Sequence, residues 1–316
     1  MNFYQVFKPY TREELHSMGI VMFDEVQDLL DSGKDPKDIF DYFNGFNEGV
    51  AVVKLNSKWN IIDIKGKLLY NQWFEYFGNF KEGFSIVKLN GKWNFIDTKG
   101  NLLSPNQWFD YVYYFKDGFA CIKLNDKWNF IDTNGKLLSP NKWFEQASNF
   151  NEGFSVVKLN GMWNFINTKC ELLSKNQWFN SVYNFHCGFG IVELNGKFNF
   201  INKKGKLLLP NLWFEKCRDF NDGFAVVELN KKWNFINKKG ELLSPNQWFD
   251  FVYNFKDGFV QVKLNGKWNF IDTKGNLLSK NQWFDYCCGF KDGFSVVELN
   301  KKRYKIDIKG YLYKNN

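Results

Sequence analysis

Histidine, the residue that most often carries acid–base chemistry, is nearly absent from this sequence. Among 316 residues there are only 2 histidines, His16 and His186. A histidine-based catalytic triad would therefore have to be built around one of them. The sequence also has no GxxxxGK[ST] phosphate loop and no GxSxG nucleophile elbow. We therefore expect a protein that is not an enzyme and that uses no metal or cofactor.

The 6 cysteines show no CxxC pair and no regular spacing. A zinc site or a disulfide framework would need such spacing, so we expect free thiols in a reducing compartment. Cys187 follows His186, but side chains adjacent in sequence rarely point at each other. We therefore favour structural drift over thiol catalysis at this pair.

Long apolar stretches and clustered charges are also absent. No run of about 18 apolar residues occurs, and the N-terminal segment lacks the basic and apolar regions of a secretory signal. We therefore expect a cytoplasmic protein without membrane insertion. The net charge of +8 is spread evenly along the chain, which argues against a nucleic-acid partner.

Aromatic residues, in contrast, are abundant and follow a regular period. They make up 20% of the chain, and one tryptophan series steps first by 34 and then by 35 residues. Phe198 stands at the fifth place of this series and Arg303 at the eighth. The first series is Trp59, Trp93, Trp128, Trp163, Trp233 and Trp268; a second series of the same period is Trp73, Trp108, Trp143, Trp178, Trp213, Trp248 and Trp283. The period divides the chain into a leader, residues 1–35, and eight repeats, residues 36–316.

Each repeat is predicted to contain a β-hairpin. The segment from Gly153 has two β-rich runs around Asn160-Gly161, and Asn-Gly favours a two-residue type I′ turn. That turn pairs Lys158 with Trp163, Val156 with Phe165, Phe154 with Asn167, Val157 with Asn164 and Ser155 with Ile166. A second turn, from Asp97 to Gly100, leads into a third apolar run, NLLS, and then into an irregular connector.

One such hairpin cannot bury its aromatic rings alone, whereas stacked hairpins can. We therefore predict an all-β array of eight three-stranded repeats in an open, twisted solenoid, with both tryptophan series packed between repeats. A closed, propeller-like ring is the alternative. In the leader, a capping box at Thr11, helical spacing from Met22 to Gly33 and a helix start at Asp35-Pro36 predict a helical cap, with partner docking as its alternative role.

The repeats resemble the WG, or KWG, repeat family. The shared pattern is a G-x-A-x-V strand, a KWG-x-ID-x-x-G hairpin and an F-[DE]…F-x-[DE]-G connector. Asparagine replaces the glycine after tryptophan at Asn60, Asn94, Asn129, Asn164, Asn199, Asn234 and Asn269. The resemblance implies a β-rich repeat array, mostly of bacterial or phage origin, and it leaves the activity undefined.

For function, we predict a scaffold that binds a protein partner along an extended surface, as solenoids do. The candidate contacts are His186 and Phe198, in the least regular repeat, and Lys88, Lys92 and Lys99 around Trp93. The alternative is a glycan-binding module that stacks exposed tryptophans on a polysaccharide.

Repeated acidic residues also precede the connector glycine, at Glu82, Asp117, Glu152, Asp222, Asp257 and Asp292. They could form a ladder of calcium ligands. Calcium loops, however, gather several acids in one turn, so we favour a role in the turns.

Overall fold

The computed structural model describes residues 23–47 and 49–314. The predicted capping box at Thr11 and the residue His16 lie outside this part of the chain. The chain divides into two compact units: the first extends to Phe150 and includes Thr168–Cys170, and the second comprises Asn151–Asn167 and the residues from Glu171 onward. Across the described residues no helix is long and apolar enough to cross a bilayer.

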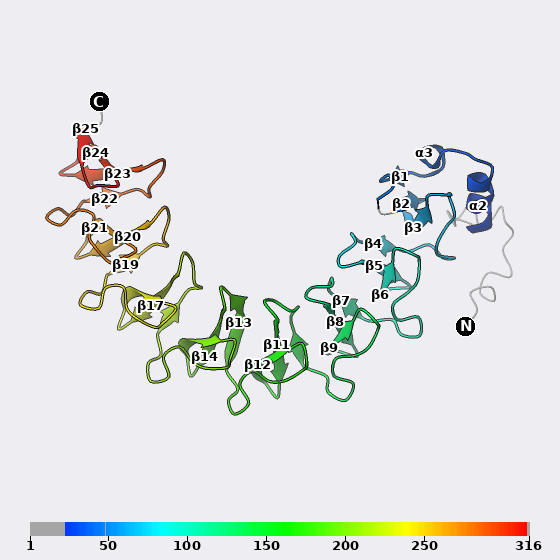
Figure 1. The fold of residues 1–316 in the computed structure, drawn as a ribbon, viewed down its shortest axis with the longest axis horizontal. Coiled ribbons are helices and arrows are strands. Elements are labelled where there is room, and N and C mark those ends of the chain that lie inside the picture. Colours follow the sequence, from blue (N-terminus) through cyan, green and yellow to red (C-terminus); the bar gives the residue numbers. More distant parts are fainter. Residues whose placement is uncertain (1–22, 48, 315–316) are drawn as a thin grey trace. The chain divides into compact units, whose positions relative to one another are not determined.

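Where the structure describes it, the first unit contains two helices and three antiparallel sheets (Figure 1). The helices are α2 (Phe23–Asp31) and α3 (Pro36–Ile39). The sheets are β1 (Tyr42–Phe43), β2 (Val50–Leu55) and β3 (Lys58–Asp63); β4 (Tyr76–Phe77), β5 (Phe84–Leu89) and β6 (Lys92–Asp97); and β7 (Tyr111–Val112), β8 (Phe119–Leu124) and β9 (Lys127–Asp132). The short strand β10 (Gln146–Ala147) follows them.

The second unit continues the same pattern. It begins with the hairpin of β11 (Phe154–Leu159) and β12 (Met162–Asn167). Its sheets are β13 (Ser181–His186), β14 (Phe189–Leu194) and β15 (Lys197–Asn202); β16 (Lys216–Cys217), β17 (Phe224–Leu229) and β18 (Lys232–Asn237); β19 (Phe251–Val252), β20 (Phe259–Leu264) and β21 (Lys267–Asp272); and β22 (Tyr286–Cys287), β23 (Phe294–Leu299), β24 (Lys302–Asp307) and β25 (Leu312–Lys314). The predicted all-β array of three-stranded repeats is therefore confirmed.

The turn chemistry sets the hairpin register. Asn160 and Gly161 have φ values of 51° and 76°, the left-handed conformation that a type I′ turn requires at both positions. The observed pairs in β11 and β12 include Lys158 with Trp163 and Val157 with Asn164, as predicted. The hairpins of the other repeats have the same register.

The third strand differs from the sequence-based prediction in every repeat but the last, where the run after the second turn forms β25. In the other repeats the NLLS run does not form a strand, as when Leu102 makes only an isolated bridge to Ile96. The connector that was expected to be irregular supplies the third strand instead, as when Tyr76 and Phe77 pair with Lys88 and Val87. This short strand precedes the hairpin and forms one edge of each sheet.

A buried asparagine holds the connector against the hairpin. Asn234, with 0% of its surface exposed, donates from Nδ2 to the carbonyl oxygens of Ser244 (2.7 Å) and Gln247 (3.1 Å). Its Oδ1 accepts from the backbone amides of Phe235 (2.8 Å) and Ser244 (3.3 Å). The side chain thus bonds four backbone groups, of which the Ser244 carbonyl also accepts from the Gln247 amide at 3.2 Å. The equivalent residue is buried in six further repeats: Asn60, Asn94, Asn129, Asn164, Asn199 and Asn269.

The hydrophobic clusters join consecutive sheets within a unit. One cluster combines Ile86 and Phe95 of one sheet with Ile122 and Ile131 of the next, and Trp143 packs against it. In the second unit Trp213 and Trp283 pack in the same way on clusters drawn from neighbouring sheets. Repeats that contact their sequence neighbours in this way form the stack typical of solenoids.

Helix α2 packs on the first sheet. Val26 and Leu30 belong to the buried cluster that contains Val53 and Ile62, and the Leu68 backbone amide donates to Gln27 Oε1 at 2.8 Å. Asp35 caps α3 by accepting from the Lys37 amide, with Pro36 in the first turn, as the sequence predicts. A docking role for the leader stays a prediction.

Candidate functional surface

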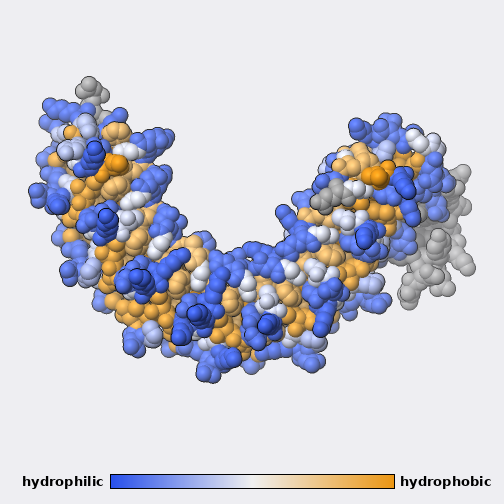
Figure 2. All heavy atoms as spheres, in the orientation of Figure 1, coloured by the Kyte–Doolittle hydropathy of each residue, from blue (hydrophilic) through white to orange (hydrophobic). Residues whose placement is uncertain are grey.

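A row of three side chains crosses each regular sheet on one face. The first residue of the short strand lies opposite a lysine of the middle strand, which lies opposite the tryptophan of the third strand. The rows are Tyr42–Lys54–Trp59, Tyr76–Lys88–Trp93 and Tyr111–Lys123–Trp128 in the first unit, and Phe251–Lys263–Trp268 in the second. In each unit we call the face of the sheets that carries these rows the row face. In Figure 2, hydrophobic residues reach the surface in patches between hydrophilic residues.

The lysine of each row covers its indole ring. Lys54 Nζ lies 5.0 Å from the centre of the Trp59 ring, and Lys88 Nζ lies 5.3 Å from that of Trp93. Such contacts are cation–π interactions. Tyrosines cover further ring surface: Tyr42 meets Trp59 edge-on at 5.6 Å. These tryptophans are consequently half-buried.

The tyrosines, in contrast, are exposed. Tyr76 and Tyr111 have relative exposures of 42% and 43%, and Tyr113, two residues after Tyr111, has 39%. Tyr113 stacks on Trp128 with ring centres 5.7 Å apart and 26° between the planes, and Tyr253 stacks on Trp268 in the same way. The row face therefore presents tyrosine rings and hydroxyls, with the indoles beneath them. The W-F-x-Tyr spacing marks these tyrosines in the sequence, but the sequence analysis placed them in an irregular connector.

In the second unit the charge at the row centre reverses in three repeats. Glu193, Glu228 and Glu298 replace the lysine. Glu228 pairs with Lys216 at 2.8 Å, and the Lys216 ammonium also lies 5.6 Å from the centre of the Trp233 ring. The cation over the indole thus comes from the short strand in this repeat.

The predicted lysine contacts have different environments. Lys88 covers Trp93, whereas Lys92 forms an ion pair with Asp110 of the following repeat. Asp110 also accepts from the backbone amide of Asn125 at 2.7 Å, so it connects two hairpin tips. The ion pair with Lys92 lowers the pKa of the Asp110 carboxyl. Lys99 lies in an exposed turn, where its amide donates to Asp97. The structure therefore does not bring the three lysines into one cluster.

The two candidates of the least regular repeat lie on different features. His186 is exposed, and its Nδ1 donates to the carbonyl oxygen of Phe220 at 3.0 Å. Cys187 occupies a turn position with φ of 53°. Phe198 is half-buried and lines a hollow of about 420 Å³ together with Tyr183 and Arg218. Phenylalanine is smaller than the tryptophan of the other repeats, which leaves room at this position.

The repeated acids belong to tight turns. Glu82 and Asp117 have φ values of 49° and 55°, each followed by a left-handed glycine. Glu82 also accepts from the backbone amides of Asp117 (3.0 Å) and Gly118 (2.9 Å) in the next repeat's turn. In the part of the chain that the structure describes, no three His, Cys, Asp or Glu side chains lie close enough to hold a metal ion.

Two buried thiols and the half-buried thiol of Cys217 have pKa values that favour the protonated form. Burial raises the pKa of Cys217 and of Cys287 to about 12, and it also raises the pKa of Cys121. Because the thiolate is the nucleophile, these cysteines are unreactive at neutral pH.

Comparison with known proteins identifies the repeat. The profile of the WG-containing repeat matches residues 39–59, 61–93, 95–128, 130–163, 179–198, 200–233 and 235–268. The chain belongs to the WG-containing repeat family. The resemblance seen in the sequence is thereby confirmed, and the buried asparagines mark this WG-repeat protein where the family pattern has glycine. No curated protein gives a significant match.

Solved structures resemble the chain only distantly. A eukaryotic initiation factor is 13% identical with a TM-score of 0.37, covering 84% of each chain. Hsv2p of Kluyveromyces lactis is 8% identical with a TM-score of 0.33, covering 73% of this chain and 92% of its own. Apo AztD from Citrobacter koseri is 11% identical with a TM-score of 0.32, covering 82% and 92%. Likenesses this weak carry no functional argument.

Proposed function

We propose that this WG-repeat protein is a non-catalytic scaffold that binds a protein partner on its row face. The supporting observation is the set of exposed aromatic side chains on the short strands and just after them: Tyr42, Tyr76, Tyr111, Tyr113, Tyr183, Phe251, Tyr253 and Tyr286. Tyrosine and tryptophan are enriched at protein interfaces, where they contribute large contact areas at a low cost in side-chain entropy.

The side chains that lie over the indole rings favour a protein partner over a glycan ligand. A sugar ring binds tryptophan by stacking on an open indole face. Here Lys123 lies over Trp128 at 6.0 Å and Tyr113 stacks on the same ring, so the chain's own side chains occupy the surface that a glycan would need. The exposed tyrosines project beyond this cover.

His186 and Cys187 support the non-catalytic part of the proposal. The histidine ring is bonded to the Phe220 carbonyl, and the cysteine stands where other repeats have a turn acid. The histidine thus has a structural contact, and the cysteine occupies a turn position.

The test compares two variants of the full-length protein in quantitative pull-downs from the native host. Tyr111→Gln with Tyr113→Ser installs the residues that Gln146 and Ser148 provide at the same positions of the next repeat. Ile64→Thr is the matched control, because Ile64 is an exposed apolar residue in a turn and the next repeat has Thr98 there.

We expect the wild type and Ile64→Thr to retain the same partner and the tyrosine double variant to lose most of it. Equal retention by all three proteins would refute the row face as the binding surface. A glycan array read by tryptophan fluorescence tests the other class of ligand, and quenching by a polysaccharide that the double variant abolishes would favour the glycan function.

A further inference from the structure

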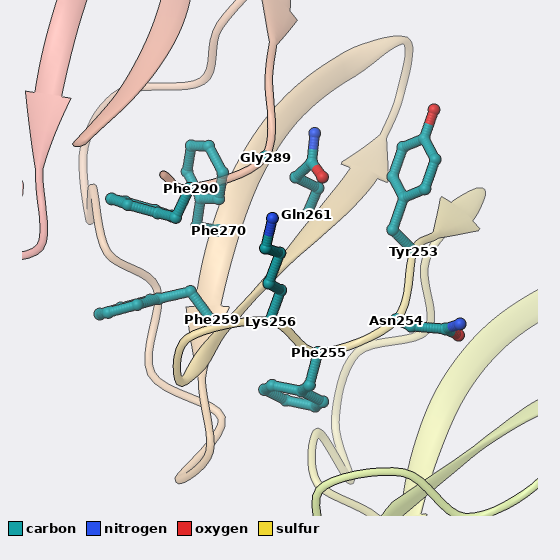
Figure 3. A pocket seen from close by; sticks show the side chains of 9 residues that line it. All are labelled: Tyr253, Asn254, Phe255, Lys256, Phe259, Gln261, Phe270, Gly289 and Phe290. Carbon is teal, nitrogen blue, oxygen red and sulfur yellow. The ribbon is translucent and has the colours of Figure 1, made fainter. Parts of the chain in front are cut away.

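One hollow of the second unit is lined differently from the equivalent places in other repeats. It has a volume of about 330 Å³ and lies between the sheet β19–β21 and the sheet β22–β25 (Figure 3). The base of the hollow, which we call its floor, consists of phenylalanines that recur in other repeats. Phe290 contacts Phe259 at 5.0 Å and Phe270 at 4.8 Å between ring centres. Phe115 makes the same contacts in the first unit. The floor therefore does not explain why a hollow opens here.

The lack of a side chain at one position explains why a hollow opens between these two sheets. Gly289 occupies a position that is asparagine in four other repeats, at Asn79, Asn149, Asn184 and Asn254. Asn149 shows what that side chain does, because its Nδ2 donates to the Tyr114 carbonyl of the preceding repeat at 3.1 Å. A Cβ placed on Gly289 would meet only Gln261 Oε1, at 3.6 Å. The hollow thus corresponds to the place that the half-buried Asn149 side chain takes in its own repeat, and the Asn254 carbonyl corresponds to that of Tyr114.

Two polar side chains face the same space. Gln261 stands where most other repeats have an aliphatic residue, and its Nε2 donates to the Cys287 carbonyl at 3.1 Å. This bond directs Nε2 away and leaves Oε1 as an acceptor toward Gly289. Figure 3 shows Lys256 extending from the edge of the hollow between Phe270 and Gln261. The hollow therefore offers one ammonium donor and two carbonyl acceptors.

We propose that this hollow binds a primary carboxamide, the side chain of an asparagine or glutamine in a peptide segment of the partner. The amide NH₂ donates to Gln261 Oε1 and to the Asn254 carbonyl, and the amide oxygen accepts from Lys256. The ligand thereby replaces the missing side chain at Gly289. A carboxylate has no proton to donate and would leave two carbonyl oxygens opposite its own, so the site selects against aspartate.

This inference rests on the proposed function and adds a second contact site for the same partner. Its test does not use the variants of the row face. The ¹⁵N-labelled full-length protein is titrated with acetyl-Gly-Asn-Gly N-methylamide and with the matched aspartate peptide. Backbone and side-chain amide signals of Gly289 and Gln261 report occupancy in TROSY spectra. The methylated terminus keeps the asparagine side chain as the peptide's one primary carboxamide.

We expect saturable shifts at both residues with the asparagine peptide and binding at least about tenfold weaker with the aspartate peptide. Gly289→Asn fills the hollow from within and should abolish the shifts. The position tolerates a side chain, because its φ lies outside the left-handed region. Gln261→Val restores the aliphatic residue found at Val226 and should weaken binding while the remaining spectrum is unchanged.

Three results would overturn the inference: equal affinity for both peptides, full binding by Gly289→Asn, or no saturable shift with either peptide. None of them affects the row-face test, because Tyr111 and Tyr113 lie in the other unit. Conversely, loss of the row-face partner leaves the peptide titration interpretable.

Discussion

Removing the buried asparagine of one repeat should destabilise the protein strongly. In Asn234→Ala, the carbonyls of Ser244 and Gln247 and the amides of Phe235 and Ser244 lose the partner that the fully buried Asn234 side chain provides, and only the Ser244 carbonyl keeps a second bond, from the Gln247 amide. Each hydrogen bond contributes a net stability of about 0.5–1.5 kcal/mol, and each unsatisfied buried group costs about 1–3 kcal/mol. Because water can reach part of the loosened connector, we expect a loss of about 3–5 kcal/mol.

The assay is urea unfolding followed by tryptophan fluorescence, together with amide hydrogen exchange at Ser244. Asn246→Ala is the control, because Asn246 lies in the same connector and is exposed, and it should change the free energy of unfolding by less than about 0.5 kcal/mol. The exchange protection of Ser244 should fall in Asn234→Ala alone. If Asn234→Ala lowers the free energy of unfolding by less than about 1 kcal/mol, packing holds the connector and the hydrogen bonds of Asn234 do not.

Three further predictions follow from single sites. Phe198→Trp should raise the free energy of unfolding in urea by up to about 1 kcal/mol, because the indole fills part of the hollow beside the ring; a loss of stability would show that the hollow cannot take it. The lowered pKa of Asp110 means that its pair with Lys92 contributes stability above the unfolded pKa of about 3.9, and that this contribution, within about 1 kcal/mol, is lost as the pH falls through the folded pKa. Urea midpoints of Asp110→Asn and wild type should therefore converge at low pH, and a constant difference would contradict the pairing. Cys187, which is exposed, should react with an aromatic disulfide at least about tenfold faster than Cys287, whose pKa is raised to about 12 by burial; equal rates would contradict the assigned burial.

Local turn chemistry made the hairpins predictable. A two-residue Asn-Gly turn admits one pairing register, so the contact of Lys158 with Trp163 followed from the sequence alone. The turn from Asp97 to Gly100 was equally predictable, because Asp97 Oδ1 accepts from the amides of Lys99 and Asn101 at 2.8 Å.

The short strand and the asparagine clamp could not be predicted in the same way. The two residues Tyr76 and Phe77 are too few to show a period of two, and their strand exists only because the middle strand of the repeat lies beside them. Asn94 bonds residues 10 and 13 positions further along, which no local propensity encodes. The hollow at Gly289 could not be predicted either, because it depends on the packing of two sheets. In the sequence, a glycine in a connector indicates only a turn.

One exposed position differs between the repeats, and we expect the specificity of the proposed partner binding to lie there. Asparagine holds the buried clamp in seven repeats, while the first residue of the short strand is Tyr42, Tyr76, Tyr111, Gln146, Ser181, Lys216, Phe251 or Tyr286. A repeat can exchange this residue freely because the clamp and the phenylalanine floor hold the sheet without it. If the row face binds the partner as proposed, recognition would be distributed over rows at a fixed period. Each row should therefore contribute its own increment of binding energy, and substitutions in separated rows should add.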